Sequence, residues 1–155
     1  MTILNLVNPE KSGIQYIINK FPDGQQNLVI KSVAKIEIML EKRNLAIQIK
    51  SRLNNWLDLE LITCAVASLR ELGVKEIHLY VPYIVGARSD RKFEEGGNNY
   101  IKDVIAPVIN SLNLKTVTCI DPHSYSLECC IKNFRSIDNS QLVKFALNQI
   151  YNENK

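Results

Sequence analysis

The sequence has no long hydrophobic run and no strong excess of charge of one sign. No stretch approaches the roughly 18 consecutive apolar residues that a membrane-spanning helix needs. The first residues, MTILNLVNPEKSG, lack the basic start and apolar stretch of a signal peptide. The net charge of +3 is too small to indicate a nucleic-acid partner. These absences predict a cytoplasmic protein that binds neither membranes nor nucleic acid.

Short motifs of several common enzyme classes are also missing. The sequence has neither the GxxxxGK[ST] phosphate-binding loop nor the GxGxxG of dinucleotide-binding proteins. The GxSxG of serine hydrolases and the HExxH of zinc proteases are absent as well. P-loop nucleotide binding, Rossmann-type dinucleotide binding and these two hydrolase classes therefore have no support in the sequence.

Cysteine is scarce and has no metal-binding spacing. Of the four cysteines, Cys64 and Cys119 lie in apolar segments, and Cys129 and Cys130 are adjacent. No CxxC pair or Cys/His spacing indicates zinc, and adjacent cysteines rarely form a disulfide with each other. We expect four buried, reduced thiols.

What is present is the composition of one ordinary globular domain. The 155 residues are 46% hydrophobic and 23% charged, which is typical of folded proteins that bury a core. The chain has no internal repeat, low-complexity tract or linker. We therefore expect a single domain over residues 1–155.

The first third of the chain has the pattern of short strands. Runs rich in β-branched residues alternate with turns, and Asp23-Gly24 in the segment FPDGQ suits a tight hairpin reversal. The pattern predicts strands at residues 2–7, 14–21, 27–32, 35–40 and 44–50.

After Asn54 the pattern changes to alternating helices and strands. Apolar residues recur at helical spacing after a capping Asn54 or Asn55, and Gly73 is placed to end this helix. We predict further helices at 100–112 with a kink at Pro107, around 124–131 and at 139–152, and strands at 75–81 and 114–120. Such alternation predicts an α/β fold with a parallel sheet covered by helices on both faces.

Two strand ends carry polar residues that suit ligand binding, because parallel sheets bind ligands at the carboxyl ends of their strands. The strand at 75–81 leads into a loop that contains Arg88 and Arg91, and guanidinium groups bind phosphate oxygens well. The strand at 114–120 leads into Asp121 and His123, a carboxylate and an imidazole that can ligate a divalent metal. The alternatives are a solvated charged loop at the first place, and a helix cap with a structural histidine at the second.

Four segments in order resemble the N-terminal, ATP-binding half of the ribose-phosphate diphosphokinases, in a compact form like that of some bacteriophages. They are FPDGQ (21–25), SRLNNWLDLELITCAVASLRELG (51–73), VPYIVGARSDRK (81–92) and IDPHS (120–124). The segment 81–92 is the most specific of them. The resemblance implies a phosphoribosyltransferase-like parallel sheet flanked by helices, with a short β-rich N-terminal part.

The resemblance also implies roles for individual residues. Arg88 and Arg91 would contact the phosphates of ATP, with Ser89 between them and Arg52 nearby. Phe21 and Asp23 would recognise the adenine bound to a neighbouring subunit, which implies a homo-oligomer. Asp121 and His123 would lie at the Mg²⁺ that accompanies ATP. Pyrophosphoryl transfer depends on positioning and charge neutralisation, so no catalytic nucleophile is expected.

The expected activity is transfer of pyrophosphate from ATP to ribose 5-phosphate, which yields phosphoribosyl pyrophosphate and AMP for nucleotide biosynthesis. In this family a second domain binds the sugar phosphate, and its acidic loop does not occur in this sequence. We therefore expect an ATP-binding half that is inactive without a second domain or chain. A different ribose phosphate as acceptor, a non-catalytic assembly module, and a binder of another phosphate ligand are the alternatives.

Overall fold

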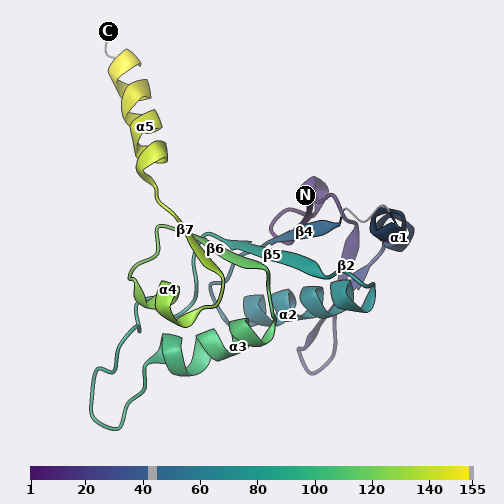
Figure 1. Cartoon of the computed structure of the whole chain (residues 1–155), viewed down its shortest axis with the longest axis horizontal. Coiled ribbons are helices and arrows are strands. Elements are labelled where there is room, and N and C mark those ends of the chain that lie inside the picture. The colour runs from purple at the N-terminus through teal and green to yellow at the C-terminus, as the bar shows by residue number, and fades with distance from the viewer. Residues whose placement is uncertain (42–44, 154–155) are drawn as a thin grey trace.

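A computed structural model describes residues 1–41 and 45–153, and its centre is a five-stranded parallel sheet (Figure 1). The strands of this sheet follow the order β1 (Thr2–Asn5), β4 (Ala46–Lys50), β5 (Glu76–Val81), β6 (Thr116–Ile120) and β7 (Phe134–Ile137). A separate antiparallel hairpin consists of β2 (Tyr16–Lys20) and β3 (Gln26–Ile30). The α/β fold and the β-rich N-terminal part expected from the sequence are both confirmed.

Helices connect the strands. The α-helices are α1 (Val33–Glu41), α2 (Trp56–Glu71), α3 (Ala106–Ser111), α4 (Ser126–Cys130) and α5 (Ser140–Glu153). A 3-10 turn, η1 (Pro9–Lys11), follows β1, and a π-helical segment, η2 (Ile101–Ile105), runs directly into α3. Near Pro107, where a kink is expected, the hydrogen bonding changes from π to α, with the proline in the first turn of α3. Among the described residues, no helix is both long enough and apolar enough to cross a bilayer.

The long helix α2 forms where the apolar spacing predicts it. Its buried side chains include Leu59, Ile62, Val66 and Leu69, which recur every three or four residues along one face. The Asn55 side chain accepts a hydrogen bond of 3.0 Å from the backbone N–H of Asp58 and caps the first turn. This capped, amphipathic helix packs one face against the sheet and the hairpin.

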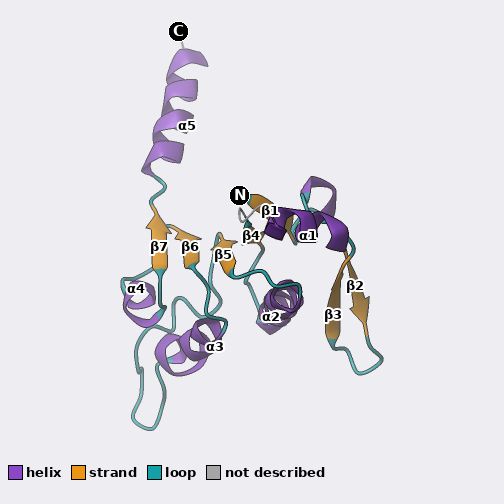
Figure 2. Cartoon of the chain, turned by 45° about the vertical axis from the view of Figure 1, so that its right-hand side comes forward, coloured by secondary structure: helices purple, strands orange, loops and turns teal. Residues whose placement is uncertain are grey.

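The two faces of the sheet differ, as side chains along a strand alternate in direction. On β5, Ile77, Leu79 and Val81 are fully buried, whereas His78 and Tyr80 on the other face are partly exposed. Figure 2 shows α2, α3 and α4 on one side of the sheet. The expected covering of both faces by helices is therefore seen on one face of the described structure.

The prediction of a strand at residues 35–40 was wrong, because this segment lies inside α1. Ile36 is fully buried while Ile38 is half exposed, and the inward positions fall at helical spacing rather than on every second residue. Topology decides the outcome. β1 and β4 are parallel neighbours, so the chain between them must cross back over the sheet, and α1 is part of that connection.

Strand β7 was missed, and the prediction of a strand at 44–50 is confirmed from Ala46 onward. Residue 44 lies outside the described residues. β7 is short, exposed along most of its length, and lacks the apolar alternation by which a strand is recognised. It forms only because β6 offers an adjacent parallel edge, with Val117 opposite Phe134 and Ile120 opposite Ile137.

The hairpin docks on α2 through side-chain hydrogen bonds. Gln26 donates to the backbone oxygen of Leu57 at 2.9 Å, and Ser68 donates to that of Leu28 at 2.8 Å. Its turn contains Gly24 at φ 92°, a left-handed conformation that glycine adopts without strain. The Asp23-Gly24 turn expected from FPDGQ is thus confirmed, and the hairpin is held at the opposite side of the molecule from α4 (Figures 1 and 2).

Helix α5 projects from the end of β7 and does not lie along the sheet (Figures 1 and 2). Its apolar side chains are exposed, with Leu142 at 69% and Leu147 at 60%. The helix expected at 139–152 is therefore present, and it adds little to the core of the described chain.

All four cysteines are free, as expected, but they are not uniformly buried. Cys119 is buried and Cys64 and Cys130 are partly buried, whereas Cys129 is exposed. Cys129 is exposed because α4 fully buries only Leu127 and turns Glu128 and Cys129 toward solvent.

Candidate functional site

A pocket of about 390 Å³ lies at the carboxyl ends of β5 and β6. The loop after β5 contributes Arg88 to its wall, and the loop after β6 contributes Asp121 and His123. Buried apolar side chains, among them Ile84 and Leu127, complete the lining. A guanidinium, a carboxylate and an imidazole from separate parts of the sequence therefore meet in one cavity.

The loop after β5 is held in shape by close packing around Gly86. Gly86 has φ 77°, and a Cβ at this position would overlap the ring of Tyr100. The hydroxyl of Tyr100 accepts a hydrogen bond of 2.8 Å from Nε1 of Trp56 on α2. The backbone N–H of Ser89 donates to the oxygen of Gly86 at 2.7 Å. This turn presents Arg88 at the pocket and leaves its side chain exposed.

The loop after β6 begins with an unusual backbone conformation at Asp121. Its φ of 43° is left-handed, a conformation that aspartate tolerates better than most residues. The backbone N–H of Asp121 donates to the oxygen of Ile137 on β7 at 2.8 Å. Nδ2 of Asn139 donates to Oδ2 of Asp121 at 2.7 Å. Contacts from β7 and the start of α5 therefore fix Asp121.

Asp90, in the loop after β5, interacts with Ser124 and His123 in the loop after β6. A hydrogen bond from the Ser124 side chain lowers the pKa of Asp90 below its usual 3.8, and the charges of His123 and Arg91 lower this pKa further. The backbone oxygen of Asp90 accepts hydrogen bonds from Nδ2 of Asn99 at 2.7 Å and from Oγ of Ser126 at 3.4 Å. Asp90 thus keeps a negative charge beside His123 at neutral pH.

The pocket also contains a thiol, Cys119, which does not suit nucleophilic chemistry. Burial raises the pKa of Cys119 to about 11. A thiol of this pKa is almost entirely protonated at neutral pH, and the thiolate is the reactive form. Cys119 therefore acts as an apolar part of the pocket wall.

The remaining residues singled out in the sequence lie outside this pocket. Arg91 is exposed and its guanidinium carbon is 5.3 Å from the centre of the Phe93 ring, a cation–π contact. Ser89 uses its backbone oxygen to accept from the N–H of Ile101 at 3.2 Å. Arg52 is exposed just beyond β4, at the same edge of the sheet as the pocket.

Phe21 and Asp23 are at the tip region of the β2–β3 hairpin, and both are exposed. The hairpin lies on the opposite side of the molecule from α4 (Figures 1 and 2), and α4 contributes Leu127 to the pocket. Within one copy of the chain, these two residues therefore do not join Arg88, Asp121 and His123.

The donor set is too small for a self-sufficient metal site. Among the described residues, no three His, Cys, Asp or Glu side chains are grouped so that they can hold a metal ion. Mg²⁺ often binds through one or two carboxylates and takes its other ligands from substrate phosphates and water. Asp121 beside Arg88 fits a metal–phosphate ligand of this kind, and His123 is in the same wall.

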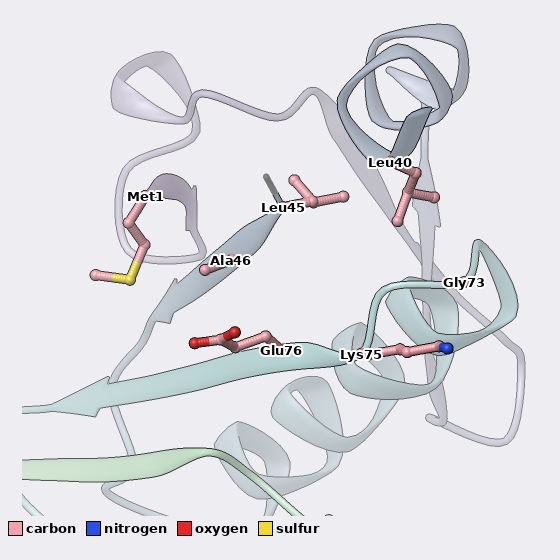
Figure 3. Close-up of a pocket in the computed structure, with 7 residues that line it drawn as sticks. All are labelled: Met1, Leu40, Leu45, Ala46, Gly73, Lys75 and Glu76. Atoms are coloured by element: carbon pink, nitrogen blue, oxygen red, sulfur yellow. The ribbon is translucent and has the colours of Figure 1, made fainter. Parts of the chain in front are cut away.

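A larger pocket, of about 600 Å³, lies at the opposite edge of the sheet, near the amino ends of β4 and β5 (Figure 3). Its lining combines the apolar Met1, Leu40 and Leu45 with the charged Lys75 and Glu76, whose side chains point in different directions. Ligands in parallel α/β sheets bind at the carboxyl ends of the strands. We therefore assign the candidate site to the smaller pocket.

The sequence predicted three of the pocket's polar residues and missed two that support them. Arg88, Asp121 and His123 were recognised because they follow predicted strands. Asp90 lies in the same loop as Arg88, but its contact with Ser124 has no sequence signal. Asn139 was missed because it follows β7, a strand that the sequence pattern did not reveal.

No protein-family model matches the chain. In sequence it is similar to the ribose-phosphate pyrophosphokinase of Saccharolobus solfataricus (strain ATCC 35092 / DSM 1617 / JCM 11322 / P2). The two are 29% identical over 104 residues, which cover 66% of this chain and 33% of that protein. In structure it is similar to the phosphoribosylpyrophosphate synthetase from Mycobacterium smegmatis, with a TM-score of 0.76 and 11% identity.

That structural match covers 97% of this chain and 53% of the solved chain. The chain thus spans about a third of the length of the curated relative and about half of that of the solved structure. The structural match shows the α/β fold, and the sequence match supports a distant relationship. The chain is therefore distantly similar in sequence to a ribose-phosphate pyrophosphokinase and similar in fold to a phosphoribosylpyrophosphate synthetase.

Proposed function

We propose that this chain is the ATP-binding part of a ribose-phosphate diphosphokinase. Such an enzyme converts ATP and ribose 5-phosphate into phosphoribosyl pyrophosphate and AMP for nucleotide biosynthesis. The observation that carries the proposal is the convergence of Arg88, Asp121 and His123 on one pocket at the carboxyl edge of a parallel sheet. The similarity to a ribose-phosphate pyrophosphokinase supports the same assignment.

Arg88 has the main phosphate-binding role in this proposal. Its guanidinium cation donates hydrogen bonds to phosphate oxygens in a planar fork. Arg91, Ser89 and Arg52 contact ATP from the solvent side of the same edge. Positive charge in this position stabilises the negative charge that develops on the phosphates as AMP leaves.

Asp121 and His123 are the residues that would hold Mg²⁺ together with the phosphates of ATP. The ion supplies charge neutralisation at the phosphates. Asp90 stabilises the same wall of the pocket because its ionised carboxylate is hydrogen-bonded by Ser124 and faces His123. The chain's own residues position the phosphates of ATP and neutralise their negative charge, and no protein nucleophile is required.

The other substrate, ribose 5-phosphate, binds to a second domain or a second chain in this proposal. Phe21 and Asp23 contact the adenine bound by a neighbouring subunit, so the active form is a homo-oligomer in the cytoplasm. Phe21 is 50% exposed, and the hairpin contributes no residue to the lining of the chain's own pocket, which supports a contact with another copy.

The test is nucleotide binding with a matched pair of arginine variants. ATP with Mg²⁺ stabilises the folded chain if it binds, by about 2.7 kcal/mol at a ligand concentration of 100 times Kd. We expect the wild type and the control Arg135→Ala to show this thermal shift, and Arg88→Ala to lose most of it. Arg135 is a suitable control because it is exposed on β7 and is not among the pocket's lining residues. An equal shift in Arg88→Ala contradicts the proposal.

Release of AMP from ATP and ribose 5-phosphate then tests how much of the enzyme the chain provides. We expect no turnover by the chain alone and turnover with a sugar-phosphate-binding domain added. If the chain alone shows turnover and Arg88→Ala abolishes it, the assignment of the ATP site stands. The need for a second domain is then rejected.

A non-catalytic assembly module is a second candidate, favoured by the exposed apolar hairpin. Ile17 and Ile18 on β2 are 41% and 42% exposed, next to the exposed Phe21. Such a surface suits pairing with another protein. An oligomer in sedimentation without any affinity for Mg²⁺ and ATP supports this candidate over the first.

A further inference from the structure

The direction of the Asp121 side chain is not set by the pleat of β6. Asp121 is the first residue after the strand and has a left-handed φ of 43°. Residues inside a strand point alternately to the two faces of the sheet, but a residue in this conformation leaves that alternation. Its carboxylate, exposed at the pocket, therefore needs other contacts to hold one orientation.

Those contacts come from the junction of β7 and α5. The backbone N–H of Asp121 donates to Ile137 at 2.8 Å, and Nδ2 of Asn139 donates to Oδ2 of Asp121 at 2.7 Å. One backbone bond and one side-chain bond to the same short segment fix both the main chain and the carboxylate. Asp121 is thus held by hydrogen bonds to the end of β7 and to the residue that precedes α5.

The junction itself is shaped by local hydrogen bonds. Oδ1 of Asp138 accepts from the N–H of Ser140 at 2.6 Å, and the backbone oxygen of Asn139 accepts from the N–H of Val143 at 3.0 Å. Hydrogen bonds from Ser140 lower the pKa of Asp138, so this cap is ionised at neutral pH. Asp138 performs the capping at the start of α5, and the Asn139 side chain is directed to Asp121.

We infer that Asn139 is a positioning residue for Asp121 as a ligand of the divalent cation that accompanies ATP. The Asn139 amide donates to Oδ2 of Asp121 and thereby orients the other carboxylate oxygen, Oδ1, toward the cation. A neutral N–H donor suits this task because it stabilises the ionised carboxylate without adding a charge that repels the metal. Hydrogen-bond partners that orient a ligand in this way contribute strongly to metal affinity in other proteins.

This inference rests on the proposed function, and a single measurement separates the two. The quantity is the factor by which Mg²⁺ tightens ATP binding, obtained by calorimetry as Kd with EDTA divided by Kd with Mg²⁺. It is measured for the wild type, Asn139→Ala, Arg88→Ala and the control Asn148→Ala. Asn148 is exposed on α5, so the control removes an amide from the same helix far from Asp121.

We expect Asn139→Ala to lose about 10- to 100-fold of this factor, as is typical when the partner of a metal ligand is removed. Its binding of ATP in EDTA and its melting temperature without ligand should stay at the wild-type values. Arg88→Ala should bind ATP weakly with or without Mg²⁺, and Asn148→Ala should match the wild type.

Three results overturn the inference, and they differ in what else they reject. An unchanged Mg²⁺ factor in Asn139→Ala, with normal ATP binding by the wild type, rejects the role of Asn139 and leaves the proposed function standing. Absence of ATP binding by the wild type rejects the proposed function and the inference together. Equal weakening with Mg²⁺ and with EDTA in Asn139→Ala also rejects it, because that pattern indicates general damage to the pocket.

Discussion

The two faces of the central sheet are built from the same strands, but one is apolar and buried and the other is polar and partly exposed. On β5, Ile77, Leu79 and Val81 are fully buried on the face that packs against α2, α3 and α4. The intervening His78 and Tyr80 are partly exposed on the other face. Burial of apolar area is the main source of stability, so the helix-covered face should supply most of the free energy of folding.

The polar face relies on weaker, specific contacts. Nδ1 of His78 is 2.7 Å from Oγ1 of Thr116 on the next strand, and Nζ of Lys50 is 5.8 Å from the centre of the Tyr80 ring. Contacts of these kinds contribute about 0.5–1.5 kcal/mol each. The candidate site lies on neither face but at the carboxyl ends of the strands, where the loops leave the sheet. Function at that edge therefore depends on the covered face for support.

The largest effect is expected on the covered face. Leu79→Ala removes buried methyl groups from the central strand and leaves a cavity, so it should lower the free energy of unfolding by about 2–5 kcal/mol. Urea denaturation measures the change. A loss below about 1 kcal/mol would show that the two faces contribute equally.

A smaller effect is expected on the polar face, at Thr116 of the neighbouring strand β6. Thr116→Val keeps the shape of the side chain and removes the hydroxyl that is 2.7 Å from His78. We expect a loss of about 1 kcal/mol in urea denaturation, the usual net value of such a hydrogen bond. A loss as large as that of Leu79→Ala would mean that the polar face is a second core.

At the carboxyl edge, stability should depend on pH through Asp90. The pKa of Asp90 in the folded chain lies below the usual 3.8, so ionisation of Asp90 favours folding. This stabilisation is complete above the usual pKa and is lost as the pH falls through the lowered pKa of the folded chain. We expect the wild type to lose more stability than Asp90→Asn between about pH 5 and pH 3. Parallel melting curves of the two proteins over this range would contradict the contact with Ser124.

The smallest effect is expected in α5, which lies on neither face. Leu147 is 60% exposed, so Leu147→Ser should change the free energy of unfolding by no more than about 0.5 kcal/mol. Urea denaturation at low protein concentration is the measurement. A loss above about 1.5 kcal/mol would indicate that α5 is packed in solution, and its dependence on protein concentration would then identify a contact between copies.

Most of the fold was predictable because its elements carry their own signals. Asn55 and the spacing of Leu59, Ile62 and Val66 identify α2, and the Asp23-Gly24 turn identifies the hairpin. The segment at 35–40 was misjudged because a short apolar alternation fits both a strand and one face of a helix. β7 was missed because its pairing partner, rather than its own side chains, makes it a strand.

The candidate site was predictable in part for a similar reason. Arg88, Asp121 and His123 follow strands whose ends are visible in the sequence, and parallel strands bring their carboxyl ends to one edge. The supporting residues Asp90 and Asn139 act through Ser124 and Asp121, which are distant from them in the sequence. Such pairings depend on which strands are neighbours, and a single sequence does not reveal that order.

The sequence by itself determined the class of the fold, the main helices and the polar residues at two strand ends, because periodicity, caps and turns act over a few residues. Only the tertiary structure decided that β6 and β7 are neighbours, that one face of the sheet is the covered one, and that Asn139 reaches Asp121. The physical reason is that these contacts join residues far apart in the chain. They form only once the apolar strands and helices have packed and brought the loops to the same edge.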